Sequence, residues 1–324
     1  MSTLDTYIEY FSALRRAPGP VWSAATQNRA PHKPILLLAV LDLVARGVIT
    51  SPVFDVTGDL VELNDLFTGY WRRIVPLAQT SSIAFPFSRL HNEPFWKLIP
   101  VPGKEITQAV INNVSSVNQL RRISSGARLD EALYYLMIQP ENRNALREIL
   151  LRSCFSEQAR LDLADQAAIN GEAYIYSQKL FNKAHQPKVE EVFGQYRASA
   201  RDQGFRRLIV RTYDHRCALC GVRIITPEGH TVVDAAHIVP WSTSQNDDAR
   251  NGMALCKLCH WNFDKGLLGI SNSYNVIVSR KISANANVPG FLVTLADRGA
   301  ILPLDHDLWP AQEYLALHRQ EWQL

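Results

Sequence analysis

Two short stretches decide the fold of the C-terminal part of this chain: CALC at residues 217–220 and CKLCHWNFD at residues 256–264. Residues 221–255 separate their two CxxC pairs. Four thiolates with this spacing suit the tetrahedral coordination that zinc prefers, so the pattern predicts a structural zinc site. Its expected ligands are Cys217, Cys220, Cys256 and Cys259. A site closed by four thiolates leaves no position for substrate, so we expect this zinc to hold the fold and to take no part in chemistry.

Three polar residues lie between and beside these pairs. His237 is followed by Ile-Val-Pro, Asn251 precedes a glycine, and His260 comes directly after Cys259. In this order they resemble the HNH nucleases, whose site is built on a ββα-metal unit, and the resemblance covers roughly residues 206–324. It implies a divalent-metal-dependent endodeoxyribonuclease.

The resemblance also implies a role for each residue. His237 would activate the attacking water, Asn251 would position the His237 ring or the loop around it, and His260 would bind a catalytic Mg²⁺ or Mn²⁺. Ala236 stands where many HNH sites place a further metal ligand. We expect Asp264, one helical turn after His260, to complete the metal sphere, with Asp234 as the alternative.

The N-terminal part carries RAPHKP at residues 29–34 and FPFSR at residues 85–89. Together with YW at 70–71 and FW at 95–96, these resemble the sulfur-binding domain that precedes HNH nucleases acting on phosphorothioate DNA, over about residues 5–155. Sulfur is larger, more polarizable and a poorer hydrogen-bond acceptor than oxygen, so an apolar cup rimmed by cations favours it. The residues implied in DNA and sulfur binding are His32, Lys33, Phe85, Pro86, Ser88 and Arg89. An alternative is that these residues are core aromatics and a helix entry.

The overall pattern predicts an α+β protein. The expected organisation is a mixed α/β DNA-reading domain with a helical extension over 1–155, a helical linker over 156–205 and the ββα-metal nuclease domain over 206–324. Helices are expected at 7–15, from about Pro34 with Gly47 just past the end, at 106–122 and at 311–322, and β-strands at 274–282 and 290–296.

Charge and composition set limits on the function. A formal net charge of +3 is too small to indicate a nucleic-acid binder by itself, so DNA contacts must come from local patches. Residues 197–223 hold seven arginines against two aspartates, and these arginines could bind phosphates or form a solvated helix face.

The N-terminus lacks the pattern of a signal peptide, no stretch is apolar enough to span a membrane, and Cys154 is expected to be a core thiol. We therefore expect a cytoplasmic protein.

The hypothesis that combines these features is a modification-dependent, type IV-like restriction endonuclease that binds phosphorothioate-modified double-stranded DNA and cuts nearby. One alternative is an HNH endonuclease that targets methylated or hydroxymethylated DNA. A non-catalytic zinc-stabilised DNA-binding protein is the other. Duplex cleavage needs two nicks, which makes a homodimer a further hypothesis. His215, His230 and His318 are expected to be structural or solvated.

Overall fold

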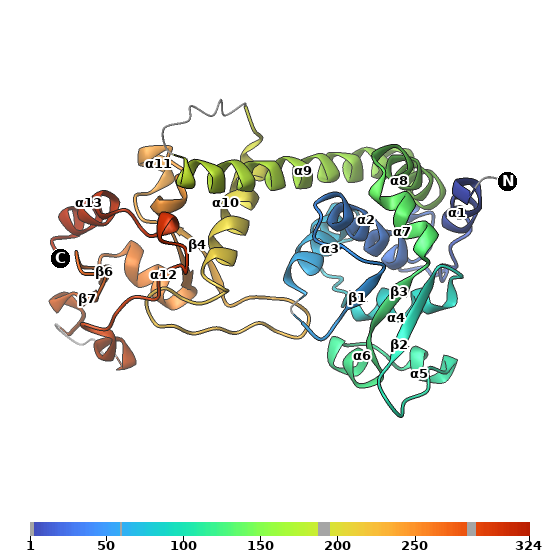
Figure 1. Ribbon diagram of the computed structural model, residues 1–324, viewed down its shortest axis with the longest axis horizontal. Helices are drawn as coiled ribbons and strands as arrows, with labels where there is room; N and C mark the ends of the chain where they lie inside the picture. Colours follow the sequence, from blue (N-terminus) through green and yellow to red (C-terminus); the bar gives the residue numbers. More distant parts are fainter. Residues whose placement is uncertain (1–2, 59, 187–194, 284–289) are drawn as a thin grey trace. The chain divides into compact units, whose positions relative to one another are not determined.

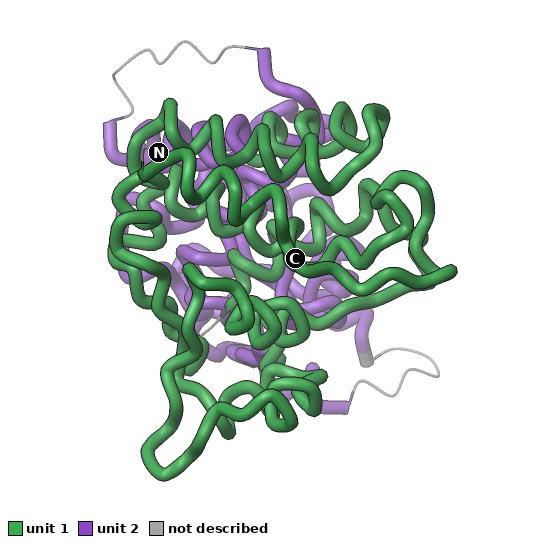
Figure 2. Tube along the Cα trace, turned by 90° about the vertical axis from the view of Figure 1, so that its right-hand side faces the viewer, with its two compact units in different colours: residues 1–170, 226–230 green, residues 171–225, 231–324 purple. Residues whose placement is uncertain are grey.

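The computed structural model describes residues 3–58, 60–186, 195–283 and 290–324 (Figure 1). The chain forms two compact units, which Figure 2 shows in different colours. The first comprises residues 1–170 and 226–230, and the second comprises residues 171–225 and 231–324. The division at residue 170 falls inside a single long helix, α9 (Glu157–His185).

The first unit surrounds one apolar helix with shorter helices and a small sheet. Helix α2 (His32–Ala45) is buried on nearly all sides, because its sequence is apolar all round. It packs against α3 (Val61–Ile74), α4 (Ala84–Arg89), α7 (Glu131–Ile138) and α8 (Pro140–Cys154). Helix α1 (Thr3–Ser12) covers α7 and α8. The sheet is antiparallel in the order β1 (Val53–Asp55), β3 (Ser124–Leu129), β2 (Trp96–Pro100).

A buried polar network ties α2 to the helices around it. The Asp42 carboxylate accepts hydrogen bonds from Arg147 at 2.6 Å, from the Tyr70 hydroxyl at 2.7 Å and from Asn170 at 2.9 Å. Asn170 lies on α9, so the first half of that helix is anchored to the core of the first unit. A buried carboxylate with three donors is satisfied, and this network is structural.

The second unit is built around two strands and a helix. Strands β4 (Val233–His237) and β5 (Gly252–Cys256) pair antiparallel, with His237 opposite Gly252, and helix α12 (Lys257–Asp264) follows β5 directly. This is the ββα arrangement. Helix α10 (Ala198–Thr212) packs on both strands. A second hairpin consists of β6 (Leu268–Ile270) and β7 (Val276–Val278), and its strand β6 contacts both α12 and α13 (Gln312–Trp322).

Two expectations for local structure were wrong. Residues 290–296 were expected to form a β-strand, but Gly290–Leu295 is a 3-10 helix, whose buried side chains Leu292 and Leu295 are three positions apart and so lie on one face of such a helix. Residues 106–122 were expected to form one helix, but α5 (Gln108–Asn112) ends before α6 (Val117–Ile123) begins. Ser116 and Gln119 form a capping box that starts α6, which explains the break.

No helix among the described residues is both long enough and apolar enough to cross a lipid bilayer.

Candidate functional site

The four paired cysteines come together at one point of the second unit. Their Sγ atoms all lie within 4.8 Å of one another, and those of Cys220 and Cys256 are 3.8 Å apart. A tetrahedral site with zinc–sulfur bonds of about 2.3 Å has edges of about 3.8 Å, so the donor set and its spacing fit zinc. The second pair lies where β5 turns into α12, so a bound zinc would brace the strand-to-helix corner.

His237 ends β4 and is held on two sides. Its Nε2 lies 2.8 Å from the Oδ1 atom of Asp247, and its ring stacks on Phe205 of α10 at 4.0 Å between ring centroids and 3° between planes. An ionised carboxylate only accepts, so Nε2 carries the proton and donates it to Asp247. Nδ1 is then the nitrogen that can take a proton from water.

A glycine makes this stacking possible. A Cβ atom at Gly252 would lie 2.5 Å from Cδ1 of Ile209 and 2.8 Å from Cζ of Phe205. Any side chain at position 252 would push α10 away from β5, and with it the ring that packs on His237. The Asn-Gly pair at 251–252 therefore serves both the loop and the helix packing.

Asn251 is completely buried and fixes the loop that follows His237. Its Nδ2 donates to the carbonyl oxygens of Val239 and Asn246, and its Oδ1 accepts from the Val239 backbone N–H at 2.9 Å. Of the two functions expected for Asn251, the contacts correspond to positioning the loop. The ring itself is held by Asp247.

His260 and Asp264 lie one turn apart on α12, with His260 Nε2 3.5 Å from Asp264 Oδ2. Both line a cleft of about 350 Å³ together with His237, Trp241 and His318. An imidazole and a carboxylate, both partly open to solvent, are donors that suit Mg²⁺ or Mn²⁺. Asp234, the alternative ligand, does not line this cleft and pairs with Arg206 at 2.9 Å, and Ala236 is buried.

Comparison with known proteins agrees with this geometry. Residues 217–271 match the family model described as HNH endonuclease. Residues 217–271 therefore form an HNH endonuclease domain.

A solved structure named "Modification dependent TagI restriction endonuclease" is similar at 21% sequence identity. The match covers 36% of this chain and 36% of that chain, so this chain spans about a third of that protein's length, and the TM-score is 0.27. No curated protein matches the chain significantly.

Two residues of the HNH domain's site gave no clear signal in the sequence. Asp247 lies ten positions after His237 in a polar loop, and only the fold brings its carboxylate to the imidazole. His318 was expected to be structural or solvated, and it is buried at the cleft wall, where it stacks on Phe263 and donates from Nε2 to the Phe263 carbonyl oxygen at 3.0 Å. Burial lowers the pKa of His318, which keeps its ring neutral.

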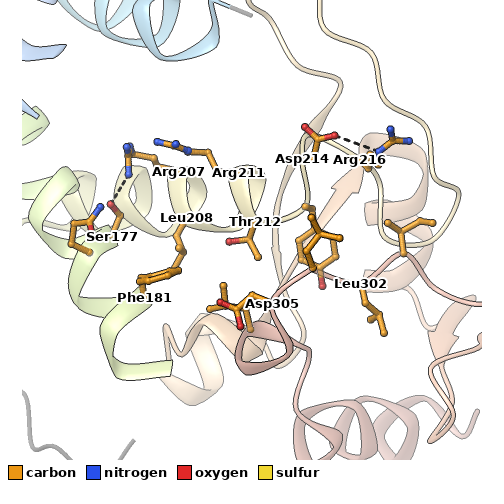
Figure 3. A pocket seen from close by; sticks show the side chains of 15 residues that line it. Ser177, Phe181, Arg207, Leu208, Arg211, Thr212, Asp214, Arg216, Leu302 and Asp305 are labelled. Carbon is orange, nitrogen blue, oxygen red and sulfur yellow. Dashed lines mark hydrogen bonds and ion pairs between the residues drawn. The ribbon is translucent and has the colours of Figure 1, made fainter. Parts of the chain in front are cut away.

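The arginine-rich segment that enters the HNH domain is largely paired within the protein. Arg197 meets Glu172 at 3.4 Å, and Arg206 meets Asp234 at 2.9 Å. Arg216 and Arg223 both meet Asp214, as Figure 3 shows for Arg216. The same view shows Arg207, bonded to Ser177, beside Arg211 at the edge of a cavity of about 700 Å³. Internal ion pairs therefore use much of the local positive excess.

The residues expected to bind DNA in the first unit gather at one pocket, apart from Ser88. The pocket has a volume of about 560 Å³. Its lining residues include His32, Lys33, Phe85, Pro86 and Arg89, and also Arg15, Arg16, Trp22 and Arg29. Ser88 is buried, and its hydroxyl donates to the Phe85 carbonyl oxygen at 3.1 Å.

His32 and Lys33, both expected to bind DNA, do not present a free positive charge in this pocket. Lys33 is buried and pairs with Glu93, so its charge is neutralised inside the protein. His32 packs against Trp22, Trp71 and Phe85, with ring centroids 4.7–5.2 Å away. Burial, with a smaller contribution from the Arg89 charge, lowers the pKa of His32 to about 4, so the ring is neutral at pH 7.

Arginines supply the positive charge of the pocket. The Arg89 guanidinium lies 3.6 Å from the centroid of the Phe85 ring and donates to the carbonyl oxygens of Asn112 and Val114. Arg16 donates to carbonyl oxygens of Thr26 and Cys154. The side chains of Arg15 and Arg29 form no hydrogen bond or ion pair with any residue that the structure describes. Sequence motifs had not singled out Arg15 and Arg16, and Arg29 stood in the RAPHKP motif without an expected role in binding.

Proposed function

We propose that this protein is a modification-dependent restriction endonuclease, in which the first unit recognises a modified DNA backbone and the HNH domain cuts the DNA. The observation that carries the proposal is that the chain has two separate sites of different chemistry. One is a cleft with a carboxylate-held histidine and a pair of candidate metal ligands. The other is a pocket of aromatic rings and arginines without any such pair of ligands.

At the cutting site, His237 accepts a proton from the attacking water at Nδ1, because Nε2 is already used in the bond to Asp247. Asn251 keeps the loop after His237 in place. His260 and Asp264 would hold the divalent cation, which stabilises the negative charge of the pentacovalent phosphate when bound. The four cysteines would hold the structural zinc that fixes the strand-to-helix corner.

At the reading site, the chemistry of the pocket favours a phosphorothioate. The walls made by Phe85, Pro86 and Trp22 offer apolar contact without strong donors, which favours sulfur over a phosphate oxygen. The neutral ring of His32 adds to this apolar wall. The negative charge of the group is met by the arginines around the pocket.

The pairing of Lys33 changes which cation meets the phosphate. Because Lys33 forms an ion pair with Glu93 inside the protein, it stabilises the pocket and does not contact the phosphate. Arg15 and Arg29 take the role of contacting the DNA backbone, since their guanidinium groups are not used by other described residues. Arginine also offers a planar pair of donors that fits two phosphate oxygens.

The test compares three duplexes of one sequence: with a phosphorothioate, with methylated or hydroxymethylated cytosine, and without modification. Binding is measured with the His237→Ala variant, and cleavage with the wild type in Mg²⁺ and in Mn²⁺. We expect tighter binding and faster cutting of the phosphorothioate duplex, and loss of this preference in Phe85→Ala. Phe181→Ala, on a surface of the second unit, is the control.

Preference for the methylated or hydroxymethylated duplex would instead support a nuclease that reads a modified base. The aromatic pocket also has room for a flipped base. Equal cutting of all three duplexes would contradict dependence on modification. Absence of cutting with either metal would contradict the roles given to the cleft. Gel filtration with and without DNA tests the proposed homodimer, and a monomer in both cases would contradict it.

A further inference from the structure

The contacts around Asp247 extend the proposed role of His237. Asp247 is 6% exposed, and its two oxygens have different partners. Oδ1 accepts from His237 Nε2 at 2.8 Å. Oδ2 accepts from the Tyr176 hydroxyl at 2.8 Å and from Arg201 Nε at 2.9 Å. A carboxylate with this many donors is fixed in both position and orientation.

We propose that Asp247 is a positioning residue, which Tyr176 and Arg201 hold in place so that it selects the ring nitrogen of His237 that faces the phosphodiester. The proposal rests on the proposed function of His237 as the base. Asp247 is buried and is not among the residues that line the cleft.

The partners of Asp247 come from separate elements. Tyr176 lies on the second half of α9, and Arg201 lies on α10, next to Phe205, the residue whose ring stacks on His237. Arg201 is itself placed by Trp241, since its guanidinium lies 3.4 Å from the centroid of that ring. The two helices pack closely: a Cβ atom at Gly204 would lie 2.6 Å from the Ala173 carbonyl oxygen. The imidazole is therefore held by α9, α10 and the loop before Asn251 together.

The electrostatics keep Asp247 ionised. Burial by itself would raise the pKa of this carboxyl, but hydrogen bonds from His237, Arg201 and Tyr176 outweigh burial and lower the pKa below its usual value. The carboxylate remains an acceptor at every pH at which the protein is expected to work. It can therefore hold a proton on Nε2 and leave the lone pair on Nδ1.

The decisive variant is Asp247→Asn, because its effect follows from the donors around it. The amide oxygen must face Arg201, which can only donate, and the Tyr176 hydroxyl can keep donating to the same oxygen. The amide NH₂ then points to His237 Nε2 and requires a lone pair there, which moves the ring proton to Nδ1. His237 would be intact, stacked and in the wrong tautomer.

We expect kcat for DNA cleavage to fall by about 10²–10⁴-fold in Asp247→Asn, with KM and DNA affinity nearly unchanged. In ¹⁵N NMR spectra, the His237 ring should be protonated at Nε2 in the wild type and at Nδ1 in the variant. Asp248→Asn is the matched control: it is the adjacent buried aspartate, it bonds to Arg250, and Asn preserves its helix cap. It should cut within about threefold of the wild type and keep the wild-type tautomer.

Tyr176→Phe gives a second test that does not risk the fold, because it removes only one hydroxyl. We expect a decrease in kcat of about 3–10-fold in the wild-type background and a much smaller effect in the Asp247→Asn background, since both act through the same imidazole. Equal effects in the two backgrounds would contradict the proposal that Tyr176 and Asp247 act through the same imidazole.

The outcomes separate this inference from the proposed function. If His237→Ala cuts as well as the wild type, the proposed function of His237 is wrong, and this inference with it. If His237→Ala is inactive while Asp247→Asn keeps wild-type kcat and tautomer, only the positioning role of Asp247 is wrong. Loss of kcat without a change of tautomer would also overturn it.

Discussion

The pocket of the first unit and the cleft of the HNH domain both contain a histidine packed against an aromatic ring, yet the two histidines differ in their partners. His32 is enclosed by three aromatic rings and has an arginine nearby, and its Nδ1 has no hydrogen-bond partner among the described residues. His237 stacks on one ring and donates to a buried carboxylate.

The difference shows that a carboxylate partner, more than burial, distinguishes a candidate base from a wall residue. Without a carboxylate, burial removes the charged form of His32 and leaves a neutral, weakly polar surface. With Asp247, one nitrogen of His237 is committed to the protein and the other is left for chemistry. The same residue type therefore fits recognition in one unit and proton transfer in the other.

The largest expected effect is the loss of zinc, which should destabilise the HNH domain and leave the first unit folded. Elemental analysis should find one zinc per chain in the wild type and none in Cys259→Ser. Loss of zinc should remove the cooperative melting of the HNH domain, because a structural zinc contributes about 10 kcal/mol or more to folding. Cys154→Ser, at a buried thiol of the first unit, should keep its zinc. Retention of zinc in Cys259→Ser would contradict the four-cysteine site.

The next effect tests the cleft alone. His237→Ala should lower the rate of DNA cleavage by about 10²–10⁴-fold, because it removes the proton acceptor, and should leave binding to the modified duplex unchanged. Single-turnover cleavage and a gel-shift assay measure the two properties separately. His306→Ala, at an exposed ring stacked on Trp309, is the control and should match the wild type. If His237→Ala lost both binding and cutting, the assignment of DNA recognition to the first unit and of cutting to the cleft would be wrong.

A third prediction concerns the pH dependence of the first unit. Because the folded pKa of His32 is about 4 and that of an unfolded histidine is about 6.5, the neutral ring favours the folded state fully above pH 6.5. This contribution is lost as the pH falls from about 6.5 toward 4, and amounts to about 3 kcal/mol. The melting temperature of the wild type relative to His32→Asn should therefore decrease between pH 7.5 and pH 4.5. A difference that is independent of pH would show that His32 does not titrate as expected.

The smallest effect tests the reassignment of the phosphate contact. Arg29→Ala should weaken DNA binding severalfold and reduce the slope of log K against log salt concentration by about 0.9, the value for one phosphate contact. Fluorescence titrations from 50 to 200 mM salt measure the slope. Arg152→Ala, whose side chain pairs with Glu148 on α8, is the control. An unchanged slope in Arg29→Ala would show that Arg29 does not contact a phosphate and that other cations of the pocket do.

Motif spacing in the sequence was informative where chemistry demands fixed residue types. Two CxxC pairs together with His237, Asn251 and His260 resembled the HNH nucleases, and the family match over residues 217–271 confirms an HNH endonuclease domain there. Local patterns were less reliable: residues 290–296 have the apolar content of a strand but form a 3-10 helix. The positions of the candidate DNA-binding residues in the first unit remain predictions about function, although most of them line one pocket.

The sequence by itself determined which atoms are available: four thiolates, two imidazoles, one amide and a carboxylate one turn after His260. These follow from spacing, because a metal or a helix turn fixes the separation of its residues along the chain. Only the tertiary structure decided how each group is used. It brought Asp247, Tyr176 and Arg201 from three separate segments to one imidazole, and it paired Lys33 with Glu93 across 60 positions. Such contacts depend on how distant elements pack, and no local pattern in the sequence encodes them.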